Sequence, residues 1–234
     1  MLRLDKFLSE MGVGTRTEVK KMIKAKRVTI DGAPASKPET KIDTETSVIC
    51  VDGREITYRK FEYYMLHKPA GVVSATVDKN DPTVIDLIKG QKRKDLFPVG
   101  RLDKDTEGLL LITNDGDLAH RLLTPGKHVD KTYFARIDSP VTAEDVELFS
   151  KGLDIGDDTL TMPAKLEILQ SGEESEILLT IQEGRFHQVK RMFEAVGKHV
   201  IYLKRISMGT LKLDDTLEKG DYRSLTTKEI DELC

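Results

Sequence analysis

Segments for crossing a membrane, for export and for redox chemistry are missing from this sequence. The 234 residues include two cysteines, Cys50 and Cys234, whose spacing suits neither a metal site nor a redox pair. No apolar run approaches the roughly 18 residues of a membrane span, and the N-terminal MLRLDKFLSEMG lacks the apolar block of a signal peptide. We therefore expect a cytoplasmic protein with no membrane partner and no disulfide.

Motifs for nucleotide, redox, zinc and serine-hydrolase chemistry are missing too. The chain has no GxxxxGK, no GxGxxG after a strand, no HExxH, no CxxC and no GxSxG. Its histidines do not fall at metal-ligand spacing, and a lone histidine is more often a surface or capping residue. They are His67, His120, His128, His187 and His199. We expect no metal and no cofactor, which leaves carboxylate chemistry open.

Charge is distributed unevenly along the chain. The formal net charge is −3, with 38% hydrophobic and 33% charged residues, as in an ordinary globular protein. The first 60 residues hold 13 Lys and Arg against 9 Asp and Glu, a net +4 that leaves −7 for the rest. A nucleic-acid partner would be held by local basic patches, because the field of the whole protein weakly repels phosphate.

The N-terminal residues carry the pattern of two short helices followed by a hairpin. RLDKFLSEMG has apolar residues at helical spacing, and Thr15 with Glu18 has the spacing of a capping box for a second helix. VTIDG and SVICVDGREI then predict short strands with Asp-Gly turns. The second helix has a basic face, which in isolation is usually just solvated surface. Its cations are Arg16, Lys20, Lys21, Lys24, Lys26 and Arg27.

This succession resembles the S4 RNA-binding domain, in which two short helices present cations to structured RNA. Contacts of this kind hold RNA by its phosphates without choosing a base. The polar stretch TYRKFE, residues 57–62, predicts a linker, so we expect an S4-like domain at 1–58 and a catalytic domain at 59–234. The resemblance implies phosphate contacts by Arg16, Lys20, Lys21, Lys24 and Arg27.

The remainder alternates strand and helix signals. EYYMLHKPAGVVSA predicts a strand broken at Pro69 and Gly71, KTYFARI and SEILLTIQ predict strands, and TAEDVELFSKG and FHQVKRMFEAVG predict helices. Thr142 suggests an N-cap, Gly197 a C-cap, and Asp115 begins a turn that caps LAHRLL. We expect an α+β protein: a small S4 module of helix, helix and hairpin, then a domain with a mostly antiparallel mixed sheet flanked by helices.

GRLDKDTEGLLLITNDGDL places an arginine and three acidic residues before an apolar strand. An extended backbone would put Arg101, Asp103, Asp105 and Glu107 on one face. Taken alone, acidic residues beside glycine are most often found in solvated loops with turn or capping roles.

The longer stretch GRLDKDTEGLLLITNDGDLAHRL closely resembles the signature of the RNA pseudouridine synthases of the RsuA branch. LHKPAGVVSA at 66, KTY at 131 and EGRFHQVKRMF at 183 match in the same order, so with the S4-like domain the resemblance spans nearly all of the chain. It implies isomerisation of uridine to pseudouridine: the C1′–N1 bond breaks, the bound uracil turns, and it rejoins through C5. Because no water is activated, one carboxylate can suffice.

The resemblance makes Asp103 that carboxylate, which either attacks C1′ or takes a proton from C2′. An ionised carboxylate in a dry pocket needs a nearby cation. Helix geometry places Lys190 on the flank of the predicted buried stripe and Arg191 roughly opposite the core, where it suits phosphate. Arg185 could serve either role. The basic partner of the aspartate in the family aligns with Lys190.

Three further residues are expected to contact RNA. The target base must leave its stack to be reached, and Tyr133 of KTY matches the family's base-stacking tyrosine. Arg101 matches the arginine that in relatives enters the helix vacated by the base, although an ion pair with Asp105 is its alternative. Lys68 of HKPAG is expected to contact phosphate.

We therefore expect a monomeric synthase for one uridine of 16S rRNA, as naked RNA or in an assembling small-subunit particle. Enzymes of this branch that act on the large subunit often carry basic C-terminal extensions, and this chain stops at SLTTKEIDELC. The alternatives are the same reaction on 23S rRNA, an inactive rRNA-binding assembly factor, or a glycosidase with Asp105 or Glu107 as second carboxylate.

Overall fold

The computed structural model describes residues 1–91, 93–127 and 129–233, which form two compact units. One unit contains Met1–Glu62 and Lys89–Leu96, and the other contains Tyr63–Ile88 and Phe97–Cys234, so the first runs past the expected boundary at residue 58. His128 and Cys234 lie outside the described residues, within which Cys50 is a free thiol. No helix in the described part is long and apolar enough to span a membrane.

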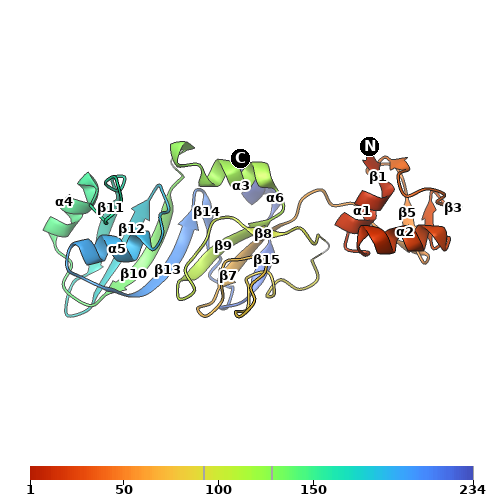
Figure 1. Cartoon of the computed structure of the whole chain (residues 1–234). Helices are drawn as coiled ribbons and strands as arrows, with labels where there is room; N and C mark the ends of the chain where they lie inside the picture. The colour runs from red at the N-terminus through yellow and green to blue at the C-terminus, as the bar shows by residue number, and fades with distance from the viewer. Residues whose placement is uncertain (92, 128, 234) are drawn as a thin grey trace. The chain divides into compact units, whose positions relative to one another are not determined.

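The first unit has the predicted order of helix, helix and hairpin (Figure 1). Its helices are α1 (Leu4–Glu10) and α2 (Arg16–Lys24). Its main sheet runs β3-β2-β5-β6, and β1 pairs separately with β4. The strands are β1 (Leu2–Arg3), β2 (Val28–Ile30), β3 (Ala33–Pro34), β4 (Lys41–Ile42), β5 (Ile49–Val51) and β6 (Arg54–Glu55).

Local sequence signals explain these elements. The capping box is confirmed, since the Thr15 backbone N–H donates to Glu18 Oε2 at 2.7 Å and the Glu18 N–H donates back to Thr15 Oγ1 at 3.3 Å. Asp31 and Asp52 have φ of 51° and 50°, and the glycine after each also has positive φ. Two successive residues of positive φ give the turn whose twist matches paired strands, so both Asp-Gly hairpins are confirmed.

The polar stretch at 57–62 packs onto the first unit. The Tyr58 ring stacks on Phe7 with centroids 5.6 Å apart, and Phe7 belongs to the core that α1 and α2 form against β2 and β5. The Glu62 carboxylate accepts from the Arg93 backbone N–H at 3.1 Å, and Arg93 also pairs with Glu10 at 3.0 Å. These contacts tie residues 89–96 to the first unit.

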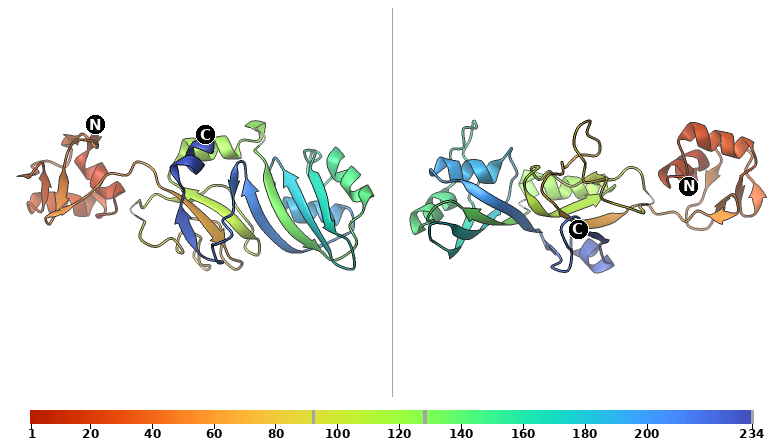
Figure 2. Two further views of the ribbon diagram at one scale, coloured as in Figure 1. Left: turned by 180° about the vertical axis from the view of Figure 1, so that it is seen from behind. Right: turned by 90° about the horizontal axis from the view of Figure 1, so that it is seen from below.

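The second unit is built on one mixed sheet of order β11-β12-β10-β13-β9-β7-β15. The neighbours pair antiparallel except for β13 and β9, which are parallel, so the predicted mostly antiparallel mixed sheet is confirmed. Seen from behind in Figure 2, β13 lies between the β10–β12 half and the β7–β9 half. The path strands are β7 (Tyr63–Lys68), β9 (Glu107–Thr113), β10 (Lys131–Ile137), β11 (Lys165–Gln170), β12 (Ser175–Ile181), β13 (Val200–Met208) and β15 (Tyr222–Ser224). Off this path, β8 (Phe97–Pro98) pairs with β9 and β14 (Leu211–Lys212) with β13.

Helices flank both halves of this sheet, as expected for the α+β class. Apolar residues of α3 (Gly116–Leu123) and α6 (Thr227–Glu232) join the core over β7 and β9, where Figure 1 shows these two helices together. At the other half, α4 (Ala143–Lys151) meets α5 (Gln188–Ala195) through Phe149 and Phe193, whose ring centroids lie 4.9 Å apart. A short 3-10 helix, η1 (Pro125–Lys127), follows α3.

The predicted helix caps are confirmed. The Thr142 N–H donates to Asp145 at the start of α4, Asp115 accepts from the Leu118 N–H at the start of α3, and Gly197 has φ 73° after α5.

The parallel junction of β9 and β13 depends on Gly108. This residue has φ +104°, and a Cβ there would lie 2.2 Å from the Arg205 carbonyl oxygen on β13. A side chain would therefore clash with the neighbouring backbone and strain its own. The close approach places the GRLD segment, which immediately precedes β9, beside the β10–β13 half of the sheet.

Candidate active site

The segment that carries Asp103 is a pinned loop rather than an extended strand. The Leu102 N–H donates to Ser74 Oγ at 3.0 Å, and that hydroxyl donates to the Leu102 carbonyl at 2.8 Å. The Thr106 N–H donates to the Asp103 carbonyl at 3.1 Å and closes a turn. The idea that the four charges from Arg101 to Glu107 alternate along an extended backbone is therefore wrong.

Lys68 is buried beneath this loop, bonds to its backbone, and is not available to phosphate. Its side chain is 0% exposed, and its ammonium donates to the carbonyls of Thr106, Pro69 and Lys104 at 2.8, 3.0 and 3.2 Å. Burial lowers the pKa of Lys68 to about 8, although the nearby carboxylates of Asp105 and Asp103 oppose that shift. The expected phosphate contact is corrected: this cation supports the backbone around Asp103.

Lys190 of α5 reaches the carboxylates that the loop presents. Its ammonium lies 3.3 Å from Asp103 Oδ2 and 2.7 Å from Asp105 Oδ1. Partial burial is the largest single influence on Asp105 and raises its pKa, but the hydrogen bond and the charge of Lys190, with smaller contributions from the backbone and His187, together hold the pKa of Asp105 below its usual value. Burial also opposes the charged form of Lys190, but the two carboxylates together outweigh burial, so the pKa of Lys190 is raised. Lys190 is thus a cation shared by two aspartates.

The helix that supplies Lys190 forms as its spacing predicts. Val189, Met192 and Phe193 are buried along one face of α5, which leaves Lys190 on the flank toward the loop. This arrangement brings Asp103 and Lys190 together from positions 87 residues apart in the sequence.

Glu107 takes no part in that cluster. Its buried carboxylate accepts from the Tyr202 hydroxyl at 2.7 Å and pairs with Lys219 at 2.8 Å. Burial is the largest single influence on Glu107 and raises its pKa, but the bonds from Lys219 and Tyr202 and the Lys219 charge together lower the pKa below its usual value. A glycosidase using Glu107 as second carboxylate would first have to break these bonds.

A hollow adjoins Asp103, whose side chain is 25% exposed. A small cavity of about 60 Å³ is lined by Arg101, Asp103 and Tyr133 among others. It shares Arg101 and Asp103 with a groove of about 450 Å³. Tyr133 of β10 is mostly buried; it lines the small cavity but not the groove. The carboxylate therefore lies where a small hollow meets a larger open groove.

His187 stands beside Asp103, although the sequence offered no reason to separate it from the other histidines. Its Nε2 lies 3.6 Å from Asp103 Oδ1, and it lines both hollows. The residue caps the start of α5 in a left-handed conformation with φ 49°. The available signal was its spacing: residues i and i+3 share a helix face, and Lys190 is three positions later.

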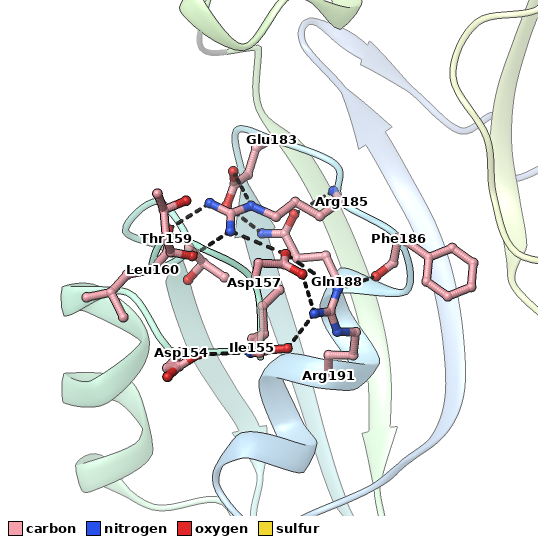
Figure 3. Close-up of polar contacts among 12 residues, drawn as sticks. Asp154, Ile155, Asp157, Thr159, Leu160, Glu183, Arg185, Phe186, Gln188 and Arg191 are labelled. Atoms are coloured by element: carbon pink, nitrogen blue, oxygen red, sulfur yellow. Dashed lines mark hydrogen bonds and ion pairs between the residues drawn. The ribbon is translucent and has the colours of Figure 1, made fainter.

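Arg185 and Arg191 each bond to other residues of the protein (Figure 3). Arg185 donates to the Thr159 and Leu160 carbonyls, each at 2.7 Å. Arg191 pairs with Asp157 at 2.5 Å and also donates to the Ile155 carbonyl. Both arginines clamp the loop between α4 and β11. The expectation that they contact RNA stays a prediction, and sequence reasoning missed their partner Asp157.

The basic face of α2 and Arg101 remain exposed. Within the part of the chain that the structure describes, no ion pair involves Arg101 or four of the α2 cations, so the alternative pair with Asp105 is wrong. Arg27 differs, since its guanidinium holds Asp52 by two hydrogen bonds of 2.8 and 2.5 Å. The exposed cations of α2 are Arg16, Lys20, Lys21 and Lys24.

No group of three or more His, Cys, Asp or Glu side chains among the described residues is placed to hold a metal. The absence of a metal and of a cofactor stays a prediction. Asp103 lies at the edge of a hollow that Tyr133 also lines, and the Lys190 ammonium lies 3.3 Å from its carboxylate. This arrangement agrees with the RNA pseudouridine synthase class that the sequence resemblance implies.

Comparison with known proteins identifies the family. The model described as RNA pseudouridylate synthase matches residues 62–195, and the S4 domain model matches residues 2–48. "Uncharacterized RNA pseudouridine synthase YtzG" of Bacillus subtilis (strain 168) is 48% identical over 231 residues, which cover 98% of this chain and 97% of that protein. "Ribosomal small subunit pseudouridine synthase A" of Vibrio cholerae is 44% identical over 230 residues, 98% of each chain.

A solved structure agrees with these sequence matches. A crystal structure of a pseudouridylate synthase aligns over 100% of both chains with a TM-score of 0.70 and 38% identity. The chain belongs to the RNA pseudouridylate synthase family, in the RsuA branch that carries an N-terminal S4 domain, and the expectation from sequence is confirmed.

Proposed function

We propose that this enzyme isomerises one uridine of 16S rRNA to pseudouridine, with Asp103 as its catalytic carboxylate. The observation that carries the proposal is the position of Asp103: partly exposed at the edge of a hollow, with the Lys190 ammonium 3.3 Å away. Relatives named for the ribosomal small subunit cover 98% of the chain at 40–44% identity and support the 16S target.

The chemistry asks little beyond that carboxylate. Asp103 either attacks C1′ and displaces the uracil, or removes a proton from C2′ to give a glycal. Both routes end when the turned uracil bonds to C1′ through C5: the Asp103–C1′ bond breaks, or the proton returns to C2′, and C5 loses its proton while N1 gains one. Lys190 keeps a positive charge beside Asp103 in a site from which bound RNA excludes water, where an ionised carboxylate is otherwise penalised. Tyr133, which lines the small cavity, stacks on the extruded uracil.

RNA is held by cations that have no ion-pair partner among the residues that the structure describes. Arg101 enters the RNA helix that the target base has left; its exposure and its position at the edge of both hollows support this role. Exposed lysines and Arg16 on α2 contact phosphates and fix the RNA without reading its bases. One copy of the chain supplies both surfaces, and the substrate is naked 16S rRNA or an assembling small-subunit particle.

The test is incubation of the protein with 16S and 23S transcripts, followed by mapping of pseudouridine with carbodiimide. Asp103→Asn should abolish isomerisation while RNA affinity and thermal unfolding stay near wild type. Asp105→Asn is the matched control, because it changes a carboxylate of the same loop that binds the same lysine. We expect this control to retain product formation.

Other outcomes would replace the proposal. Product in 23S rRNA alone would move the target to the large subunit. Release of free uracil would indicate a glycosidase, and a deletion strain with unchanged rRNA pseudouridines would indicate a binding factor without activity. An Asp103→Asn enzyme that still makes pseudouridine would end the catalytic assignment.

A further inference from the structure

An aromatic ring stands exposed at the entrance to the candidate active site. Phe186 is 76% exposed and lines the groove of about 450 Å³ that also contains Asp103. Single exposed apolar residues are common on protein surfaces, so exposure alone indicates nothing. Phe186 is distinguished by its place in this groove, by its ring partner and by the rigidity of its backbone.

The ring has a partner on one face. The Phe186 ring lies nearly parallel to the His187 imidazole, with centroids 3.8 Å apart and planes inclined by 18°. His187 is itself placed against Asp103. The pair therefore forms a stacked platform that runs from the carboxylate to solvent.

The backbone that carries this platform is clamped. The Phe186 carbonyl accepts from Arg191 at 3.1 Å, and the preceding Arg185 donates to the carbonyls of Thr159 and Leu160. Figure 3 shows the Phe186 ring pointing away from this polar cluster while its carbonyl faces it. Since the segment is already ordered, a ligand that stacks on the ring has little loop entropy to overcome.

The chemistry of the groove around the ring suits a strand of nucleic acid. Arg101 lines it and can meet a phosphate, while Phe186 and Val73 offer apolar surface to a base; Lys104 also lines the groove, but its ammonium pairs with Asp81 at 2.7 Å. Phe186 does not line the small cavity that holds Tyr133, so the two aromatic residues face different spaces. A base stacked on Phe186 is therefore a different base from the one against Tyr133.

We propose that Phe186, supported by His187, stacks on the base of a nucleotide adjacent to the target uridine. This inference rests on the proposed function, because it requires the target uridine to enter beside Asp103. The stack would keep the RNA strand in place after the target base leaves the helix. Its contribution to RNA affinity would require a base at the adjacent position and would not depend on the phosphate contacts.

A double-mutant cycle between protein and RNA tests this role. The RNA is the short segment in which wild-type enzyme forms pseudouridine, prepared intact and with an abasic site on the 5′ or on the 3′ side of the target. For intact RNA, Phe186→Ala should raise Kd about 5- to 150-fold, as expected for loss of one base–aromatic stack. For one of the abasic RNAs, wild type and Phe186→Ala should bind equally.

Two further variants serve as controls. Phe186→Tyr keeps an aromatic ring and should bind intact RNA within about threefold of wild type. Leu169→Ala removes another exposed apolar side chain, from β11, and should leave Kd unchanged. Thermal unfolding of each variant excludes a general loss of structure.

Independent effects would overturn the inference: if Phe186→Ala weakens intact and both abasic RNAs by the same factor, or leaves intact RNA unaffected, the ring does not stack on a neighbouring base. Failure of the proposed function looks different, because wild-type enzyme would then form no pseudouridine in any rRNA transcript.

Discussion

Replacing Lys190 by methionine should separate the charge at the active site from the stability of the fold. In the native protein its ammonium lies 3.3 Å from Asp103 and 2.7 Å from Asp105. Methionine keeps the length and apolar stem but leaves the two carboxylates with no cation between them. We expect kcat for isomerisation to fall while the thermal midpoint changes little.

The magnitude follows from these distances. Two unit charges 3.3 Å apart interact by about 5 kcal/mol at an effective dielectric constant of about 20, before desolvation is subtracted. The net value of a hydrogen bond to a charged group is smaller, about 1.5–3 kcal/mol. If that stabilisation is required in the transition state, kcat falls about 10- to 150-fold. Lys190→Arg keeps the charge and should recover part of the loss.

Lys198→Met is the matched control. Lys198 pairs with Asp145 at 2.6 Å, and that mostly buried carboxylate also caps α4 by accepting from the Thr142 N–H. Removing the partner of a buried charge costs about 3 kcal/mol or more, which lowers the thermal midpoint by roughly 6–12 °C at this chain length. Its kcat at a temperature where it is folded should match wild type.

Single-turnover rates on 16S transcript and thermal unfolding of the three variants give the comparison. The reasoning is refuted if Lys190→Met turns over within twofold of wild type, because the ammonium then contributes nothing to the reaction. It is also refuted if Lys190→Met loses activity only in proportion to a drop in its folded fraction.

Two further changes test how the fold positions the site. Because burial lowers the pKa of Lys68 from 10.5 to about 8, between these values the unfolded chain binds a proton that the folded protein does not. The free energy of unfolding of wild type, measured relative to that of Lys68→Met, should therefore rise from pH 8 to 10.5. The rise should be at most about 3 kcal/mol, and less where water screens the ammonium. Denaturant titrations across that pH range measure it, and a difference that stays flat or falls would contradict this. Gly108→Ala should lower the free energy of unfolding by about 3 kcal/mol or more, since its Cβ would lie 2.2 Å from the Arg205 carbonyl oxygen. Gly116→Ala is the control, because a Cβ there would meet no atom within 4 Å, and it should unfold near the wild-type temperature. Equal thermal midpoints for the two variants would show that the β9–β13 junction tolerates a side chain.

Features governed by local spacing were predictable from the sequence. The Asp-Gly hairpins, the caps at Thr15, Thr142 and Asp115, and the amphipathic face of α5 each depend on residues a few positions apart. Such signals fix where an element begins and which face it buries. The pairing of Asp103 with Lys190 also agreed with expectation, but there the family resemblance supplied the partner and helix geometry only favoured it.

Partners from distant segments were not predictable. Lys68 is buried by carbonyls that lie up to 38 residues later, and Arg191 meets Asp157 from 34 residues away. A charge in the sequence looks the same whether it will be solvated or enclosed. The central strand β13 was not predicted from the sequence for a related reason. Its Arg205 is buried and donates to the Leu109 carbonyl of the neighbouring strand β9, whereas a charged residue in the sequence suggests exposed surface.

The cations of this protein divide by what already holds them. Three cations, Lys68, Arg185 and Arg191, donate hydrogen bonds to carbonyls and carboxylates around the Asp103 loop and the start of α5. These bonds are already formed in the protein without RNA. Arg101 and the lysines of α2 have no such bonds within the described residues and are the cations that we propose to contact phosphate. If the proposal is right, RNA binds without breaking the contacts that set the geometry of Asp103 and Lys190. A site that must turn a base over without releasing it depends on that geometry staying fixed, because the recaptured ring has to meet the same sugar carbon.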